Sequence, residues 1–257
     1  MRWLAGLLLC WLAAGPAQAA SVFDPAAVGA PGSNAPSELF RPEGAGPFPA
    51  VVVLHGCDGV GPHYRDWARR LAGWGYVALL VDSFRPRGHA MVCNERKLVP
   101  AEDRADDAYA AAAWLRAQGF VRADRVGMIG FSHGGWSVLK AVLADRAAGQ
   151  PAPPFAAAVA FYPGCQRPTA PLITDTLILI GEADDWTPAR FCSAWRHKVA
   201  KNGHAMEFRP YPGALHGFDS ARPPHAFAGH HVGRNDAAAA QAEAAVREFL
   251  AARLERP

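Results

Sequence analysis

The sequence lacks any long run of charges of one sign, and it lacks a hydrophobic segment of the length that crosses a bilayer. Its 26 Lys and Arg stand against 23 Asp and Glu, and basic residues gather no more densely than in pairs such as Arg69-Arg70. A nucleic-acid partner is therefore not expected. Of the 257 residues, 51% are hydrophobic and 19% charged, which is the composition of a globular chain that buries one large core.

The most apolar run lies at the start of the chain, where Trp3–Ala14 follows the single charge of Arg2. This run is shorter than the about 20 residues that a spanning helix needs. It leads through Gly15-Pro16 to the small-x-small site Ala17-Gln18-Ala19, a pattern typical of a secretory signal peptide over residues 1–19. The alternative, a buried N-terminal helix, leaves the small-x-small ending unexplained. Cleavage after Ala19 predicts an exported protein, periplasmic or secreted, that keeps no membrane anchor.

Cysteine is scarce, with five in the chain, and the sequence has no CxxC pair or His/Cys cluster at metal-ligand spacing. No metal site is therefore predicted. Signal cleavage removes Cys10 and leaves Cys57, Cys93, Cys165 and Cys192. Paired thiols become disulfides in an oxidising compartment, and four cysteines allow three pairings. Because Cys57, Cys93 and Cys165 each follow a predicted strand, we favour the pairing Cys57–Cys93 and Cys165–Cys192.

The rest of the chain divides into an arm and one domain. Residues 20–47 are rich in Pro, Gly, Ala and Ser, which predicts an extended N-terminal arm with a short strand near Ser37–Arg41. Residues 48–257 contain no internal repeat and no interdomain linker, which predicts a single domain.

Short apolar runs alternate with helical patterns throughout this domain. The apolar runs predict strands buried on both faces at residues 50–54, 77–81, 126–130, 157–162, 177–180 and 206–211. The helical patterns cover residues 64–74, 102–118, 134–148, 188–202 and 236–253. This alternation predicts a mostly parallel sheet with helices on both faces. Ligands of such sheets bind beyond the carboxyl ends of the strands, so functional residues are expected just after each strand.

A nucleophile is predicted at Ser132. Gly130-Phe131-Ser132-His133-Gly134 follows a predicted strand and precedes a predicted helix, as the G-x-S-x-G turn requires. The turn is so sharp that small residues must stand two positions away on either side. The motif alone is common, and the alternative is a glycine-rich turn with a structural serine. Its place between strand and helix favours Ser132 as the nucleophile.

A serine hydroxyl needs a base, and the base needs an orienting carboxylate. In this type of fold the carboxylate follows the serine along the chain and the histidine comes last. Past the strand at residues 177–180 lie Glu182, Asp184 and Asp185. We favour Asp184, because Asp185 is also suited to cap the helix that begins near Pro188.

The base is predicted at His216, which stands in a glycine-bounded loop after the last strand. The other histidines downstream of the nucleophile turn are weaker candidates, since they lie near a helix or in a long polar loop: His197, His204, His225, His230 and His231. The alternative for His216 is a loop histidine that has no catalytic role.

The oxyanion hole is expected beside the first strong strand, which ends in His55-Gly56-Cys57-Asp58-Gly59. A peptide N–H from this loop and the N–H after the nucleophile form the hole in this type of fold. We assign the two donors to Cys57 and His133. His55 is expected to brace the loop, and Cys57 is not expected to act as a nucleophile, because a disulfide would cap its thiol.

These residues together resemble the dienelactone hydrolase family of α/β hydrolases. The likeness runs from about Ala50 to Arg253 and depends on five segments: His55-Gly56-Cys57-Asp58-Gly59, Val81-Asp82-Ser83-Phe84, Gly130-Phe131-Ser132-His133-Gly134-Gly135, Gly181-Glu182-Ala183-Asp184 and His216-Gly217-Phe218. The resemblance implies the α/β-hydrolase fold and assigns the nucleophile, acid and base to Ser132, Asp184 and His216.

The chain departs from the family at two places. The founding members carry cysteine at the position of Ser132, and they carry a glutamate in the loop after the first strand, where Asp58 is the nearest carboxylate here. Family members also hold a substrate carboxylate with arginine, and Arg85 or Arg87 is expected to do so, against the alternative of two solvated loop arginines. Trp186 is a further candidate for the substrate pocket.

The predicted function is hydrolysis of a small ester or lactone through an acyl-enzyme, with no cofactor. One alternative is a peptidase of the same fold, although such enzymes usually add a propeller or a large lid domain and only residues 219–235 here suggest a modest lid. A second alternative is a binding protein that keeps the fold without turnover. Proteins of that kind generally lose a member of the triad, and none is missing here.

Overall fold

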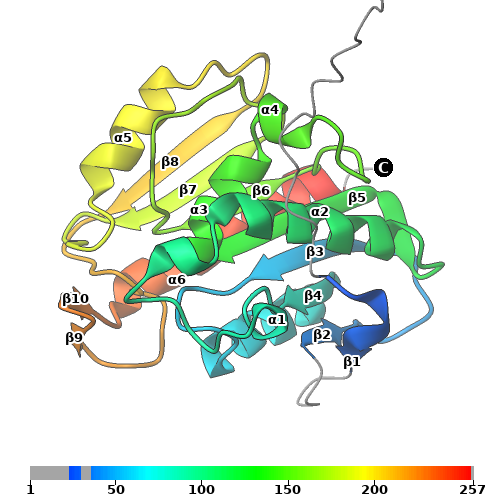
Figure 1. The fold of residues 1–257 in the computed structure, drawn as a ribbon, viewed down its shortest axis with the longest axis horizontal. Helices are drawn as coiled ribbons and strands as arrows, with labels where there is room; N and C mark the ends of the chain where they lie inside the picture. Colours follow the sequence, from blue (N-terminus) through cyan, green and yellow to red (C-terminus); the bar gives the residue numbers. More distant parts are fainter. Residues whose placement is uncertain (1–22, 30–35, 256–257) are drawn as a thin grey trace, which may run out of the picture.

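An eight-stranded sheet forms the centre of the protein in the computed structural model (Figure 1), which describes residues 23–29 and 36–255. The predicted signal peptide lies outside the described residues. The strands are β1 (Val28–Gly29), β2 (Ser37–Phe40), β3 (Phe48–Leu54), β4 (Val77–Val81), β5 (Val121–Phe131), β6 (Ala158–Phe161), β7 (Thr176–Gly181) and β8 (Met206–Tyr211). Their order across the sheet is β1-β2-β4-β3-β5-β6-β7-β8.

The sheet is parallel from β4 to β8, and only the pairing of β2 with β4 is antiparallel. All residues of β4, β6 and β7 are buried, as are the last five of β3. Strands covered on both faces by helices need apolar side chains throughout, which explains the continuous apolar runs of the sequence. The carboxyl ends of β3, β5, β7 and β8 therefore meet at one edge.

Helices cover both faces of the sheet (Figure 1): α1 (Pro62–Gly73), α2 (Ala101–Arg116), α3 (His133–Ala141), α4 (Ala144–Ala147), α5 (Ala189–Lys198) and α6 (Asp236–Leu250). Connections between parallel strands are right-handed, so the direction of each connection determines on which face of the sheet its helix lies. The connection from β3 through α1 to β4 runs in one direction across the sheet, and those through α2, α3 and α5 run in the other. Helices α2 and α3 thus share a face, and α1 lies opposite, where Arg70 pairs with Glu243 of α6 at 3.1 Å.

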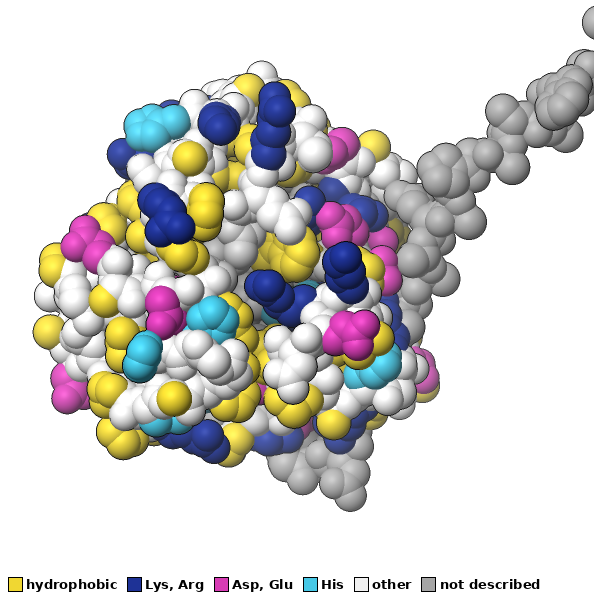
Figure 2. All heavy atoms as spheres, turned by 60° about the vertical axis from the view of Figure 1, so that its left-hand side comes forward, with side chains coloured by type: hydrophobic (Ala, Val, Ile, Leu, Met, Phe, Trp, Pro, Cys, Tyr) yellow, Lys and Arg dark blue, Asp and Glu magenta, His cyan; other side chains and the backbone are white. Residues whose placement is uncertain are grey.

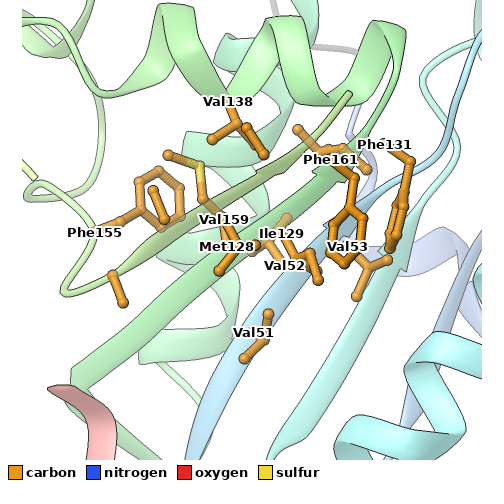
Figure 3. Packing of buried hydrophobic residues seen from close by; sticks show 14 of the residues in the cluster. Val51, Val52, Val53, Met128, Ile129, Phe131, Val138, Phe155, Val159 and Phe161 are labelled. Carbon is orange, nitrogen blue, oxygen red and sulfur yellow. The ribbon is translucent and has the colours of Figure 1, made fainter. Parts of the chain in front are cut away.

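The core lies between these layers. Figure 3 shows Val138 of α3 above Met128 and Val159 of the central strands, and Phe131 beside Phe161. The rings of Phe131 and Phe161 stack with centroids 5.0 Å apart. Phe131 immediately precedes Ser132, so this packing fixes the end of β5 from which the predicted nucleophile projects.

The α/β-hydrolase architecture agrees with the sequence prediction, and three details differ from it. The predicted helix at 134–148 breaks after Ala141, where Leu143 bridges to Leu172 instead of continuing the helix. The short strand predicted near Ser37–Arg41 is present as β2, but the arm adds a second strand, β1, that was not predicted. Residues 219–235 contain a hairpin, β9 (His225–Phe227) and β10 (His230–Val232), that the sequence analysis did not predict.

Two disulfides link Cys57 to Cys93 and Cys165 to Cys192, the pairing that the sequence favoured. The Cα atoms are 4.8 Å and 4.9 Å apart. The first disulfide joins the loop after β3 to the loop after β4, which a backbone hydrogen bond from Val92 N–H to Cys57 O also connects. None of the helices in the described ranges is both long and apolar enough to cross a membrane.

Candidate active site

Ser132 stands at a sharp turn between β5 and α3. Its backbone has φ 53° and ψ −111°, a conformation that side-chain-bearing residues seldom adopt. A Cβ on Gly130 would lie 2.3 Å from the carbonyl oxygen of Gly134, and a Cβ on Gly134 would lie 2.3 Å from the carbonyl oxygen of Leu54. Both positions of the G-x-S-x-G motif are therefore glycine because backbone occupies the space of a side chain.

Ser132, His216 and Asp184 lie in one hydrogen-bonded chain. Oγ of Ser132 is 2.9 Å from Nε2 of His216, and Nδ1 of His216 is 2.8 Å from Oδ2 of Asp184. Because an ionised carboxylate only accepts hydrogen bonds, Nδ1 carries the imidazole proton. Nε2 is then left with a lone pair directed at the Ser132 hydroxyl. This arrangement can take the hydroxyl proton as the oxygen attacks a carbonyl carbon.

Asp184 is held by four donors. Its Oδ1 accepts from the backbone N–H groups of Trp186 and Thr187 at 2.9 Å and 2.7 Å. Its Oδ2 accepts from the Thr187 hydroxyl at 2.9 Å and from His216. Burial alone raises the pKa of Asp184, but the hydrogen bonds and charge of His216, with those of Thr187, outweigh burial and lower it. The carboxylate is thus ionised and oriented at neutral pH.

The alternative acid, Asp185, points elsewhere. Its Oδ2 lies 2.9 Å from Nδ1 of His231, and its Oδ1 lies 3.4 Å from Nδ1 of His230. Both histidines belong to the β9–β10 hairpin, which also contacts the site through Trp186. The indole of Trp186 stacks on His230 and packs against His216, with ring centroids 4.8 Å and 4.9 Å apart. Asp185 therefore fastens the hairpin beside the site and does not cap α5.

The remaining candidate histidines have other partners or none at the site. His204 lies 3.4 Å from Asp175, and His225 lies 2.8 Å from the carbonyl oxygen of Pro223. His197 is exposed on α5. The histidine that reaches Ser132 within the described ranges is His216.

The two predicted oxyanion donors lie on the same cavity as Ser132. This cavity is lined by Cys57, Arg96, Ser132, His133, Trp136, Gly164, Trp186 and Thr187. Within the described part of the chain, the N–H groups of Cys57 and His133 make no hydrogen bond. The N–H of His133 also stands at the first turn of α3, where the helix dipole favours negative charge.

His55 and His133 are buried neutral imidazoles. Burial, followed by the charge of Arg104, lowers the pKa of each to about 3. Nδ1 of His55 donates to the carbonyl oxygen of Gly56 at 2.7 Å, which agrees with its expected bracing of the loop. Neither ring is available as the base of the reaction.

Arg85 and Arg87 do not line the cavity. The guanidinium of Arg85 pairs with Asp82, and that of Arg87 lies 2.6 Å from Asp107 and 2.8 Å from the carbonyl oxygen of Ser83. The arginine that does line the cavity is Arg96, in the short turn Arg96–Leu98. Figure 2, turned to bring the carboxyl edge of the sheet forward, shows basic and histidine side chains around a hollow on this face.

Arg96 and Thr187 line the cavity and Arg104 lies behind it, and none of the three was predicted from the sequence. The loop after the strand at 77–81 offered several arginines, and nothing in its pattern distinguished Arg96. Thr187 follows Asp184 by three positions, the spacing at which an Asp carboxylate accepts from nearby backbone N–H groups, and that signal was available. Among the described residues, no group of three or more His, Cys, Asp or Glu is arranged to hold a metal ion.

Comparison with known proteins agrees with this geometry. The sequence model of the dienelactone hydrolase family matches residues 36–254. A Bradyrhizobium protein described as a probable 2-oxo-3-(5-oxofuran-2-ylidene)propanoate lactonase is 29% identical over 220 residues, 76% of this chain and 86% of its own. A putative carboxymethylenebutenolidase of Methylorubrum extorquens is 29% identical over 203 residues, 71% of this chain and 67% of its own.

A solved structure is similar over a comparable length. The putative dienelactone hydrolase of Klebsiella pneumoniae superposes with a TM-score of 0.66 and 26% identity, covering 84% of this chain and 92% of that one. Because the family match spans most of the chain, including every segment that forms the cavity, the protein belongs to the dienelactone hydrolase family.

Proposed function

We propose that this protein is an exported serine hydrolase that cleaves carboxylic esters or lactones. Ser132 acts as nucleophile, His216 as base and Asp184 as the carboxylate that orients the base. The observation that carries the proposal is the hydrogen-bonded chain from Ser132 Oγ through His216 to Asp184, with steps of 2.9 Å and 2.8 Å. Membership of a hydrolase family and the lactonase described among its relatives support the same chemistry.

The first half-reaction forms an acyl-enzyme. Nε2 of His216 takes the Ser132 proton while Oγ bonds to the carbonyl carbon, and the carbonyl oxygen becomes negatively charged. The N–H groups of Cys57 and His133 stabilise this oxyanion. The tetrahedral intermediate collapses, the bond to the leaving oxygen breaks, and His216 returns the proton to that oxygen.

The second half-reaction restores the enzyme. Water replaces the leaving group, His216 takes its proton, and the resulting oxygen attacks the acyl carbon. Ser132 Oγ leaves with the proton and the carboxylic acid is released. In a lactone the leaving oxygen stays attached to the acyl chain, so the product is a single hydroxy acid. No step in this sequence requires a metal or an organic cofactor.

Substrate contacts are proposed for the residues around the cavity. The indole of Trp186 lines it and supplies an apolar surface for an acyl or alcohol group. Arg85 and Arg87 remain proposals for binding a substrate carboxylate, and each would first have to leave its partner, Asp82 or Asp107. Arg96 needs no such rearrangement.

The test is hydrolysis of p-nitrophenyl acetate, p-nitrophenyl butyrate and an unsaturated five-membered lactone by the oxidised protein. Ser132→Ala should lower kcat by several orders of magnitude, since an unaided oxyanion hole keeps only about 10³–10⁴-fold catalysis over water. Ser193→Ala on α5 is the matched control and should keep the native rate. A fluorophosphonate should label the native protein at Ser132.

The alternatives predict other results. Release of p-nitroaniline from peptide anilides without hydrolysis of the esters would indicate a peptidase. Inertness toward every substrate together with resistance to the fluorophosphonate would leave a binding protein of the same fold. Either outcome would overturn the proposal that the protein hydrolyses esters or lactones.

Export is proposed from residues 1–19 and is consistent with the two disulfides, which persist in oxidising compartments. The full chain should be recovered outside the cytoplasm with Ala20 as its first residue, as measured by intact mass after fractionation. Recovery from the cytoplasm with residues 1–19 attached and free thiols would contradict export without affecting the hydrolase.

A further inference from the structure

One buried arginine connects the loop after β3 to the start of α3, the two segments that carry the proposed oxyanion donors. Arg104 lies on α2 and its side chain is wholly inaccessible to solvent. One terminal nitrogen donates to the carbonyl oxygen of His55 at 2.7 Å, and the other donates to Nδ1 of His133 at 2.8 Å. His55 precedes Cys57 by two residues, and His133 directly follows Ser132. A single planar group thus spans both halves of the oxyanion hole.

The charge of Arg104 has no counter-ion in contact. Within the described ranges no carboxylate lies within 4.0 Å of its guanidinium, and its Nε has no hydrogen-bond partner. The neighbouring carboxylates, Asp82 and Asp107, are already paired with Arg85 and Arg87. Burial lowers the pKa of Arg104 to about 10, which still leaves it charged at neutral pH.

Such an arrangement is costly for stability, because a buried charge loses its hydration and here gains only the more distant charges of Asp107 and Asp82 in place of a direct ion pair. Because stability alone does not account for a buried cation at this place, its two hydrogen bonds point to a role in the reaction. The guanidinium packs over Phe84, 4.8 Å from the ring centroid, and Phe84 in turn contacts both imidazoles. The packing holds the cation in place behind the cavity, which it does not itself line.

We propose that Arg104 is a positioning residue for ester or lactone hydrolysis. It aligns the N–H groups of Cys57 and His133 on one point and places a positive charge behind the oxyanion that forms there. This inference rests on the proposed hydrolase function. Arg104 touches no substrate, so its contribution belongs to the transition state and should appear in kcat more than in KM.

The test compares Arg104→Met, Arg104→Lys and Arg116→Met. Arg116 is the matched control: it lies on the same helix and donates to the carbonyl oxygens of Ala123 and Pro154, away from the site. Arg104→Met should lower kcat by about 10²-fold, as the loss of one oxyanion donor does, with KM nearly unchanged. Arg116→Met should keep the native kcat.

A second readout separates this role from a structural one. An alkyl boronic acid becomes a tetrahedral anion when Ser132 Oγ adds to it, whereas an unreactive amide analogue binds only as the ground state. The boronic acid should lose affinity in Arg104→Met by the same factor as kcat, and the amide should not. Equal losses for both ligands would indicate a general distortion and overturn the proposal.

Arg104→Lys keeps a charge but offers one point of attachment where the guanidinium offers two. It should fold and show an intermediate loss of kcat, about tenfold. Arg104→Lys keeps the proposal testable if Arg104→Met does not fold. A native kcat in Arg104→Lys would show that the two hydrogen bonds of the guanidinium are not needed, and it would overturn the proposal. If the native protein itself hydrolyses nothing, the proposed function fails, which differs from an active native protein whose Arg104 variants are equally active.

Discussion

Thr187 donates to Asp184 twice, through its backbone N–H to Oδ1 at 2.7 Å and through its hydroxyl to Oδ2 at 2.9 Å. The hydroxyl shares its single proton between Asp184 and the carbonyl oxygen of Tyr162, which lies 3.0 Å away, and its oxygen lies 3.1 Å from Nδ1 of His216. Thr187 therefore ties the loop after β7 to the loop after β6, at the point where the carboxylate orients the imidazole.

Thr187→Val tests the hydroxyl alone, because valine keeps the shape and the backbone donor. We expect kcat/KM to fall about tenfold, since one of the hydrogen bonds that orient Asp184 is lost at a cost of about 1–2 kcal/mol. Steady-state kinetics with p-nitrophenyl butyrate measure it. Thr174→Val, a buried threonine outside the site, is the control. An unchanged kcat/KM in Thr187→Val would assign the orientation of Asp184 to the backbone donors alone.

The two disulfides should differ in their effect on activity more than in their effect on stability. They join residues 36 and 27 apart, for which loop entropy predicts similar contributions of about 3.8 and about 3.6 kcal/mol. Only Cys57–Cys93 contains a proposed oxyanion donor. We expect both Ser/Ser double variants to lose similar amounts of Tm, whereas kcat should fall much further in Cys57→Ser/Cys93→Ser.

Thermal unfolding and steady-state kinetics on both double variants measure this difference. The Cys165–Cys192 variant is the reference, although Gly164 beside it also lines the cavity. Equal losses of kcat in the two variants would contradict the special role of the first disulfide.

Arg96 should select substrates by charge. It is the cation that lines the cavity in the described chain, and no acidic partner contacts its guanidinium there. Arg96→Gln should raise KM for an ester that carries a free carboxylate and leave KM for a neutral ester of equal size unchanged. Arg85→Gln tests the competing proposal, and Arg69→Gln, at an exposed arginine of α1, is the control. A charge-dependent loss in Arg85→Gln but not in Arg96→Gln would reverse the assignment.

The pair of His63 and Asp219 should make stability fall as pH rises. Burial alone lowers the pKa of His63, but Asp219, 3.3 Å away, outweighs burial and raises it. A raised pKa stabilises the fold fully below the unfolded value of about 6.5, and this contribution is lost as the pH rises through the folded value.

We therefore expect Tm of the native protein to decline as the pH rises above about 6.5, with a shallower decline in His63→Gln. The slope is the informative quantity, because the variant also loses ring packing against Phe131 at every pH. Parallel slopes would show that the pair contributes nothing to the pH dependence.

The strands were the most predictable part of the fold. Val77–Val81 has the bounds that its composition indicated, because helices bury this central strand on both faces and leave no room for polar residues. Met206–Tyr211 also has the predicted bounds, but it is the edge strand of the sheet, and most of its residues are only partly buried or exposed. The β9–β10 hairpin could not be predicted, because each of its strands has only three residues, which is too short for a periodic pattern to show.

Some residues of the candidate site could also be predicted from the sequence, and others could not. Ser132, Asp184 and His216 follow strands that the pattern identified, so their meeting at one edge could be inferred. Arg104 could not, because the Glu102–Asp107 segment has the composition of a solvated helix start, and only the tertiary structure buries its charges.

The strained turn at Ser132 limits which substitutions evolution can accept at this position. A non-glycine residue held at φ 53° and ψ −111° costs about 1–3 kcal/mol, a sizeable part of the about 5–15 kcal/mol that keeps a domain folded. Ser132→Gly would relieve this strain, because glycine adopts positive φ freely, but it would also remove the hydroxyl that reaches His216. At position 132, selection for durability and selection for turnover therefore act in opposite directions.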